Sequence, residues 1–248
     1  MNKNILINFL ETSKILSCIS LLALYNFIMV LIYSPNIDFI SAFLTIVCNN
    51  MYTAILSVIF LICTISTMIN CDSSHYVIQR MKSKKQYYWF QLKYVLTVNL
   101  IIFTVNLIFL FTFLNLFADN ITIYSYMNYS FSNLIYSLFI IFKHLLVYTF
   151  LIYLFLSIMK LFGSKISLII NGLICVFPLG ISYILKVDDT SNVMQMLYWN
   201  HLKMQYYSSF TIELVTIIKF ILFSFIVVLF IYKFTIFKVK NGEIKWNF

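Results

Sequence analysis

Long apolar runs, separated by short polar segments, dominate the chain. Few residues interrupt these runs, because the sequence holds only 4 Gly and 2 Pro. A helix rises about 1.5 Å per residue, so roughly 20 apolar residues cross a bilayer core of about 30 Å, whereas a membrane strand shows alternating segments of about 10 residues. The runs predict an all-α membrane protein with six transmembrane helices, over 15–34, 45–69, 95–117, 132–158, 166–185 and 210–234.

The composition supports this class. Of the 248 residues, 62% are hydrophobic and 10% are charged, whereas a soluble domain carries about 25% charged residues. No internal repeat is evident, so we expect one transmembrane domain over 1–248. The net charge of +9 would fit nucleic acid, but the basic residues lie in short loops beside apolar runs, the pattern that orients a membrane protein. We therefore expect no nucleic-acid partner.

The distribution of Lys and Arg predicts the orientation. Thirteen of the 17 Lys and Arg residues fall in segments on the same side of the six spans as both termini, and only Lys186 and Lys203 fall on the other side. Lys143 and Lys219 lie within spans. Cytoplasmic segments carry the excess of Lys and Arg, so both termini are expected in the cytoplasm of a multi-pass protein of the cell membrane.

Segments at the membrane borders predict further structure. Residues 2–14 place apolar and charged side chains on different sides, which favours an amphipathic helix along the inner leaflet over a frayed tail. The second run starts near residue 39 but contains the Asn pair 49–50, so either the chain touches the outer interface before this pair or the helix is long. Residues 186–209 mix Trp and Tyr with polar groups, which predicts one or two short extracellular helices, interfacial or re-entrant, before the last span. A kink at 178–180 would let the chain bend into that arrangement.

One loop, between spans two and three, is far more basic than the others. Its sequence, HYVIQRMKSKKQYYWFQLKY at 75–94, holds five of the 17 Lys and Arg residues. The serine pair at 73–74 offers candidate N-caps for a short helix over 75–81, and a basic turn over 82–85 follows. The aromatic residues 87–89 are then expected at the inner membrane interface, which Trp and Tyr favour.

Two explanations fit the charges of this loop. The first is orientation plus attraction to anionic lipid, worth about 1 kcal/mol per basic residue near the surface, and it accounts for the lysines. It does not explain why the chain's single arginine, Arg80, lies here within a compact helical unit. Arginine offers a planar fork that suits carboxylates, so the second explanation is that Tyr76 and Arg80 dock on a partner protein.

The pattern as a whole resembles the ABC-2-type permeases, the membrane subunits of ATP-binding-cassette exporters. The resemblance covers the topology of the whole chain: six spans, inside termini, an amphipathic N-terminal segment and an interfacial loop before span six. Arg80-Met81-Lys82-Ser83-Lys84-Lys85, followed by aromatic residues and Lys93, is similar to the loop after the second span in that family. The acidic residue that often precedes this loop there has only Asp72 as its counterpart.

The resemblance implies partners for the chain. In the family this loop forms a coupling helix that binds a separate cytosolic ATPase, so the expected contact residues are His75, Tyr76, Gln79, Arg80, Lys82, Lys84 and Lys85. A second permease subunit, identical or different, is also implied. The chain lacks G-x-x-x-x-G-K-[ST] and has only four glycines for a phosphate loop, so we expect ATP and Mg²⁺ on the partner and no cofactor in this chain.

The function implied is that of an exporter subunit in a bacterial cell membrane that moves an amphipathic peptide or a lipid-like molecule. A composition rich in Ile, Asn, Lys, Phe and Tyr also resembles permeases of low-GC Gram-positive bacteria, many of which serve peptide export or self-protection against bacteriocins. One alternative is a non-transporting immunity or sensor protein. Another is an ion-coupled secondary transporter, which would favour paired intramembrane carboxylates or broken helices in repeated halves.

No catalytic motif is present, so we do not expect an enzyme. The chain has no H-E-x-x-H and no G-x-S-x-G. Its three histidines fall in different topological zones, and its five cysteines show no C-x-x-C or other metal-ligand spacing. We therefore expect no metal site.

Four polar residues in the spans are candidates for a substrate path. A lysine at the centre of a membrane helix costs about 2.5–3.5 kcal/mol, so such a group normally faces a partner, a cavity or the bundle interior. One hypothesis is a polar lining of the path, and another is a Lys143–Glu213 pair that bridges spans four and six. The alternative is structural, because long lysine side chains reach the interface by themselves. The candidates are Lys143, His144, Glu213 and Lys219.

Overall fold

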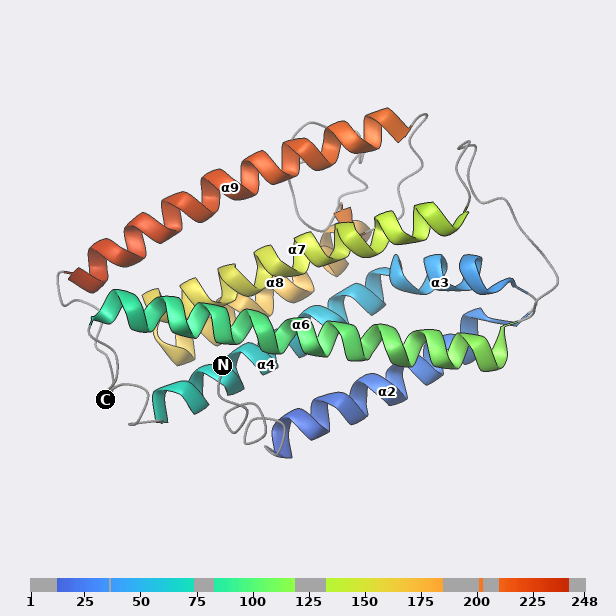
Figure 1. The fold of residues 1–248 in the computed structure, drawn as a ribbon, viewed down its shortest axis with the longest axis horizontal. Helices are drawn as coiled ribbons and strands as arrows, with labels where there is room; N and C mark the ends of the chain where they lie inside the picture. The colour runs from blue at the N-terminus through green and yellow to red at the C-terminus, as the bar shows by residue number, and fades with distance from the viewer. Residues whose placement is uncertain are drawn as a thin grey trace.

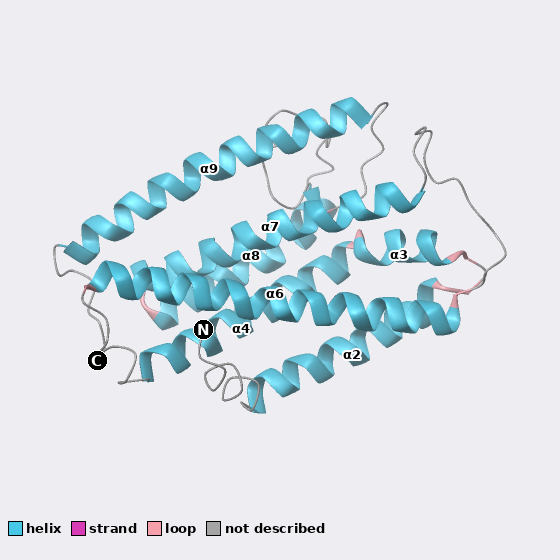
Figure 2. Ribbon diagram, in the orientation of Figure 1, coloured by secondary structure: helices cyan, strands magenta, loops and turns pink. Residues whose placement is uncertain are grey.

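The computed structural model is a bundle of long helices that run roughly side by side (Figure 1). It describes residues 13–35, 37–73, 83–118, 133–184, 201–202 and 210–240, and these contain no strand (Figure 2). The described helices are α2 (Ser13–Tyr33), α3 (Phe39–Val47), α4 (Asn50–Ser73), α6 (Lys84–Phe117), α7 (Asn133–Phe162), α8 (Ser164–Ile184) and α9 (Phe210–Lys240).

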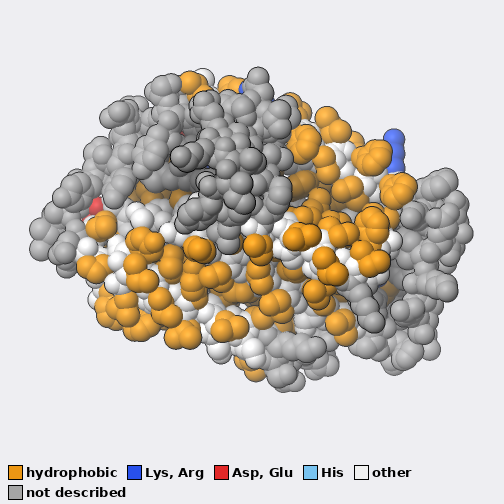
Figure 3. Space-filling view, turned by 180° about the vertical axis from the view of Figure 1, so that it is seen from behind, with side chains coloured by type: hydrophobic (Ala, Val, Ile, Leu, Met, Phe, Trp, Pro, Cys, Tyr) orange, Lys and Arg blue, Asp and Glu red, His pale blue; other side chains and the backbone are white. Residues whose placement is uncertain are grey.

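Five of these helices, α2, α4, α6, α7 and α9, are long and apolar enough to cross a membrane. Helix α8 has 21 residues, about 31 Å, but its apolar stretch with described side chains, Ile166–Val176, is shorter than a span. Hydrophobic side chains dominate the described part of the face in Figure 3. On α9, Ile226 and Phe230 are 65% and 72% exposed, as expected for lipid-facing residues. The chain is an all-α, multi-pass membrane protein.

The helices reach beyond the predicted spans at one end of the bundle. We call this the basic end, because it holds Lys84, Lys160 and Lys240. Helix α6 begins at Lys84, not at 95, and α9 ends at Lys240, not at 234. The prediction counted apolar residues, whereas the backbone hydrogen bonds of a helix continue through polar residues at the interface. The rings of Trp89 and Tyr232, 5.6 Å apart, hold α6 against α9 at this end.

The second predicted span, 45–69, is not one continuous helix, because the helix is broken between α3 and α4. The Asn49 side chain accepts a hydrogen bond from the Met51 N–H (2.9 Å) and donates one to the Tyr33 hydroxyl (3.0 Å). Asn49 therefore caps α4, supplying an acceptor to backbone donors that a helix start leaves unpaired. Helix α3 packs against α2, α6 and α7, and six of its nine residues are buried, so it is part of the bundle interior.

The start of α6 corrects two expectations. Ser83 caps the helix by accepting a hydrogen bond from the backbone N–H three residues on (3.2 Å), so residues 84–85 form the first helical turn and not a loop. Tyr87 and Tyr88 are 4% and 2% exposed, and only Trp89, at 40%, faces outward. Successive helical residues point about 100° apart, so three consecutive aromatic residues could not all anchor one interface.

A single residue, Gly163, joins α7 to α8. Its φ of 76° lies in the left-handed region, which glycine adopts without steric cost, and its N–H bonds the Met159 carbonyl at 3.2 Å to close α7. Asn171 Nδ2 donates to the Phe155 carbonyl at 3.3 Å across the pair. The two helices therefore form a tight antiparallel hairpin, and α8 continues as a helix through the predicted kink at 178–180.

A buried polar cluster of Asn26, Tyr52 and Asn106 joins α2, α4 and α6. Asn26 Nδ2 donates to Asn106 Oδ1 (2.9 Å), and Asn106 Nδ2 donates to the Tyr52 hydroxyl (2.8 Å). The Tyr52 hydroxyl donates to Asn26 Oδ1 (3.0 Å). Each residue is at most 2% exposed, so the polar atoms of the cluster hydrogen-bond to one another in a bundle where lipid offers them no hydrogen bonds.

Two buried thiols, Cys18 on α2 and Cys63 on α4, also lie close enough for their side chains to interact. We expect dibromobimane, which becomes fluorescent once it has alkylated two nearby thiols, to label the chain in membranes. The signal should disappear in Cys18→Ser and persist in Cys175→Ser, which removes a buried thiol on α8. Undiminished fluorescence of Cys18→Ser would contradict this packing of α2 on α4.

Candidate functional site

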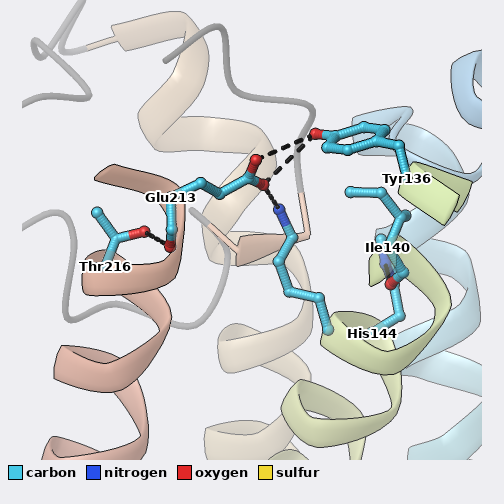
Figure 4. Close-up of polar contacts among 6 residues, drawn as sticks. Tyr136, Ile140, His144, Glu213 and Thr216 are labelled. Atoms are coloured by element: carbon cyan, nitrogen blue, oxygen red, sulfur yellow. Dashed lines mark hydrogen bonds and ion pairs between the residues drawn. The ribbon is translucent and has the colours of Figure 1, made fainter. Parts of the chain in front are cut away.

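An ion pair is buried between α7 and α9. Lys143 Nζ lies 2.9 Å from Glu213 Oε1, and the two residues are 2% and 1% exposed (Figure 4). No other ion pair is found within the described part of the chain. The pair predicted from the sequence is therefore confirmed as a contact.

Helix geometry explains how the two side chains meet. Side chains on a helix lean toward its N-terminus, so Lys143 extends toward the end of the bundle where α9 begins. Glu213 lies in the first turn of α9, where the positive end of the helix dipole favours a carboxylate. Tyr136, two turns before Lys143 on α7, donates its hydroxyl to both Glu213 oxygens at 3.4 Å (Figure 4). The Glu213 carboxylate is thus stabilised by the Lys143 ammonium, by the Tyr136 hydroxyl and by the N-terminal end of α9.

The burial of this pair makes it sensitive to movement. A charge inside an apolar interior is costly unless an opposite charge and hydrogen bonds compensate it. Lys143 and Glu213 come from different helices, so any separation of α7 from α9 at this end would expose both charges to lipid or admit water. The pair can therefore hold the two helices together, or release them when its charge or its hydration changes.

Other polar groups surround the pair. The His144 ring bonds the Ile140 carbonyl through Nδ1 at 2.9 Å (Figure 4) and also interacts with the backbone of Val47 and Leu202. Cys48, at the end of α3, lies within electrostatic reach of both Lys143 and Glu213. Helix α3 packs against α7, and α7 packs against α9, so the break between α3 and α4 lies on the side of the bundle that holds the ion pair.

Lys219 does not belong to this cluster. It follows Glu213 by six residues on α9, which turns it about 240° around the helix axis, and it is half-buried. The structure therefore brings Lys143, His144 and Glu213 together, and it places Lys219 on another face.

The two predicted coupling residues that the structure describes lie on a part of the backbone away from the ion pair. Lys84 and Lys85 occupy the first turn of α6 at the basic end, whereas Glu213 lies at the opposite end of α9. The remaining predicted contact residues lie outside the described part of the chain: His75, Tyr76, Gln79, Arg80 and Lys82. Residues 2–12 of the predicted amphipathic segment 2–14, and most of the interfacial segment 186–209, also lie outside it.

Sequence reasoning missed Tyr136 as a partner of Glu213. The signal was available, because residues seven apart lie on the same face of a helix, and Tyr136 precedes Lys143 by seven. Across the described residues, no three His, Cys, Asp or Glu side chains lie close enough together to hold a metal ion.

The fold and the site define a multi-pass helical membrane protein with a buried ion pair between α7 and α9. No family model, no curated protein and no solved structure matches the chain. Its function is therefore inferred from its own residues.

Proposed function

We propose that the chain is the permease subunit of an ATP-binding-cassette exporter, with six spans, both termini in the cytoplasm and ATP hydrolysed by a separate ATPase. The observation that supports this most is the form of α6. This helix follows the predicted coupling segment directly, begins with Lys84 and Lys85, and packs against α2, α3, α4, α7 and α9. A force applied at its first turn therefore reaches most of the described bundle.

The length of α6 suits it to this role. Its 34 residues extend about 51 Å, more than the roughly 30 Å of a bilayer core. Its first turn can therefore stand clear of the hydrocarbon at the basic end, within reach of a cytosolic protein. A continuous helix transmits displacement along its axis because each turn is hydrogen-bonded to the next.

Polar contacts tie α6 to its neighbours at three levels. Near the basic end, the Tyr88 hydroxyl lies 3.5 Å from Ser157 Oγ on α7. Midway, Asn99 Nδ2 donates to Thr64 Oγ1 on α4 at 3.2 Å. Further on, Asn106 belongs to the buried cluster with α2 and α4. Such contacts have defined partners, so α6 is held in one register and cannot slide freely along apolar surfaces.

The proposed cycle starts at the ATPase. Two permease subunits, identical or different, bind two ATPases, and ATP draws the ATPases together. The coupling segment and α6 pass this movement to the bundle, and the Lys143–Glu213 contact opens as α7 and α9 separate. The cargo is an amphipathic peptide or lipid-like molecule that enters from the bilayer, and Lys143, His144 and Glu213 are proposed to face it.

Association with the ATPase tests the proposal. We expect the chain in nanodiscs to bind the ATP-binding-cassette ATPase encoded beside its gene, and Arg80→Glu/Lys84→Glu to weaken binding at least about tenfold, because charge reversal at a docking surface is repulsive. Lys233→Glu is the control, since this exposed lysine lies at the basic end of α9. Biolayer interferometry measures both. If the double variant binds the ATPase with wild-type affinity, or if Lys233→Glu loses as much affinity as the double variant, the docking assignment is refuted.

A second candidate is an ion-coupled transporter, which the buried Lys143–Glu213 pair favours. Intramembrane ionisable pairs mark proton and ion pathways in pumps and transporters. Transport assays in vesicles separate the two candidates. A protonophore should stop an ion-coupled transporter, whereas removal of ATP in the presence of the ATPase should stop an exporter of the proposed type.

A further inference from the structure

A cavity of about 180 Å³ lies between α4, α6 and α7. Its buried floor consists of Phe60, Asn99, Phe103 and Tyr148, and its rim includes the half-exposed Leu100. Asn99 lies near the middle of α6, so the cavity is expected at the level of the hydrocarbon core. Because Leu100 faces outward on a membrane helix, the cavity opens toward lipid and not toward water.

Asn99, one of the residues that line this cavity, carries an acceptor without a hydrogen-bond partner. Its Nδ2 donates to the Val95 carbonyl (2.9 Å) and to Thr64 Oγ1 (3.2 Å), and since a carbonyl only accepts, the Val95 contact identifies the amide nitrogen. Asn99 Oδ1 is buried and has no hydrogen-bond partner. A buried carbonyl oxygen without a donor is costly, so a guest that supplies an N–H or O–H to Asn99 Oδ1 would remove this cost.

The walls suit an aromatic guest. The Tyr148 ring lies 4.8 Å from the Phe60 ring and 6.0 Å from the Phe103 ring, centroid to centroid. Aromatic rings attract one another in stacked and edge-on arrangements over such distances. An engineered apolar cavity of about 150 Å³ in another protein binds benzene, so this slightly larger cavity matches a ring with one substituent or a small fused ring.

We propose that this cavity binds a small aromatic ring that carries a single N–H or O–H donor, enters from the bilayer and donates to Asn99 Oδ1. A free membrane-dissolved indole or phenol has this chemistry, and so does the Trp or Tyr side chain of a membrane-bound peptide. The site does not depend on the ATPase partner, and it is tested without one.

The test compares two probes of the same shape. 5-Fluoroindole has the N–H donor, and 5-fluorobenzofuran has an oxygen in its place. ¹⁹F NMR titration of the full chain in lipid nanodiscs, corrected with empty nanodiscs, gives an affinity for each. We expect 5-fluoroindole to bind about three- to tenfold more tightly, which is the range that one net hydrogen bond provides. Asn99→Leu should abolish this preference.

Asn171→Leu is the matched control. Asn171 is also fully buried with an unpartnered Oδ1, but it lies on α8, away from the cavity, so its substitution should leave the preference intact. Leu100→Trp changes only an exposed rim residue and should weaken both probes at least about fivefold by narrowing the opening. Equal affinity of the wild type for both probes, a preference that survives Asn99→Leu, or unaltered binding to Leu100→Trp would overturn the proposal.

A final experiment distinguishes a free aromatic compound from a peptide side chain as the guest. A hydrophobic helical peptide with one central Trp is compared with the same peptide carrying Phe. Displacement of 5-fluoroindole by the Trp peptide alone assigns the site to a peptide side chain, and displacement by neither peptide assigns it to a free compound.

Discussion

Lys143→Met and Glu213→Gln are each expected to lower the free energy of unfolding by about 3–5 kcal/mol. Each change leaves the other charged group buried without its partner, because both residues are at most 2% exposed. The double variant should recover most of the loss, because no isolated charge remains inside the bundle. Unfolding in mixed micelles, followed by circular dichroism, gives the four free energies of a double-mutant cycle.

The control for this cycle is Lys233→Met. This lysine is exposed on α9, so its substitution should change stability by less than about 0.5 kcal/mol. If the effects of Lys143→Met and Glu213→Gln are additive, the 2.9 Å contact does not stabilise the bundle and the description of the site is wrong.

The double variant also separates folding from transport. Lys143→Leu is expected to impair transport while the chain still inserts in the membrane, but a single variant confounds function with stability. A double variant that is stable and does not transport would assign the pair a role beyond holding α7 to α9. Normal transport by it would remove Lys143 and Glu213 from the proposed substrate path.

The second large effect is expected at the cluster of Asn26, Tyr52 and Asn106. Asn106→Leu removes every hydrogen bond that the Asn106 side chain makes with Asn26 on α2 and with Tyr52 on α4. It leaves the Asn26 amide and the Tyr52 hydroxyl each short of one partner in a region without water. We expect a loss of about 1–2 kcal/mol in the free energy of unfolding, measured in the same micelle assay.

Thr104→Val on the same helix is the matched control. Thr104 is exposed, and its hydroxyl bonds only the Leu100 carbonyl of its own helix (2.9 Å), so its removal should cost less than about 0.5 kcal/mol. Equal losses in Asn106→Leu and Thr104→Val would show that the cluster does not join the three helices.

Much of the fold could be predicted from the lengths of the apolar runs. Lipid selects uninterrupted apolar helices, so the predicted span 15–34 lies close to α2, and 210–234 starts where α9 starts. The Lys143–Glu213 contact was predictable for a related reason. An isolated charge in a span is costly, and Glu213 is the acid that the spans offer to Lys143.

The break at Asn49 and the burial of Tyr87 and Tyr88 could not be predicted in the same way. An asparagine in an apolar run can lie inside a helix, where its side chain hydrogen-bonds to a neighbour, or it can cap the start of a helix. The sequence does not decide between these two positions, whereas in the structure the position of Tyr33, which accepts from Asn49, does. Likewise, the faces that Asn26 and Asn106 present depend on how three helices pack. The six-span topology, the coupling segment and the ATPase partner stay predictions.

The one-residue connection at Gly163 has a consequence for how the chain enters the bilayer. Helices α7 and α8 are too closely tethered to be released from the translocation machinery as independent segments, so they are expected to insert as a preformed unit. The same tether acts as a pivot. The half of α7 that holds Lys143 can move while the other end of α7 stays attached to α8. A residue with a β-carbon at position 163 would be strained at this φ and would restrict the movement.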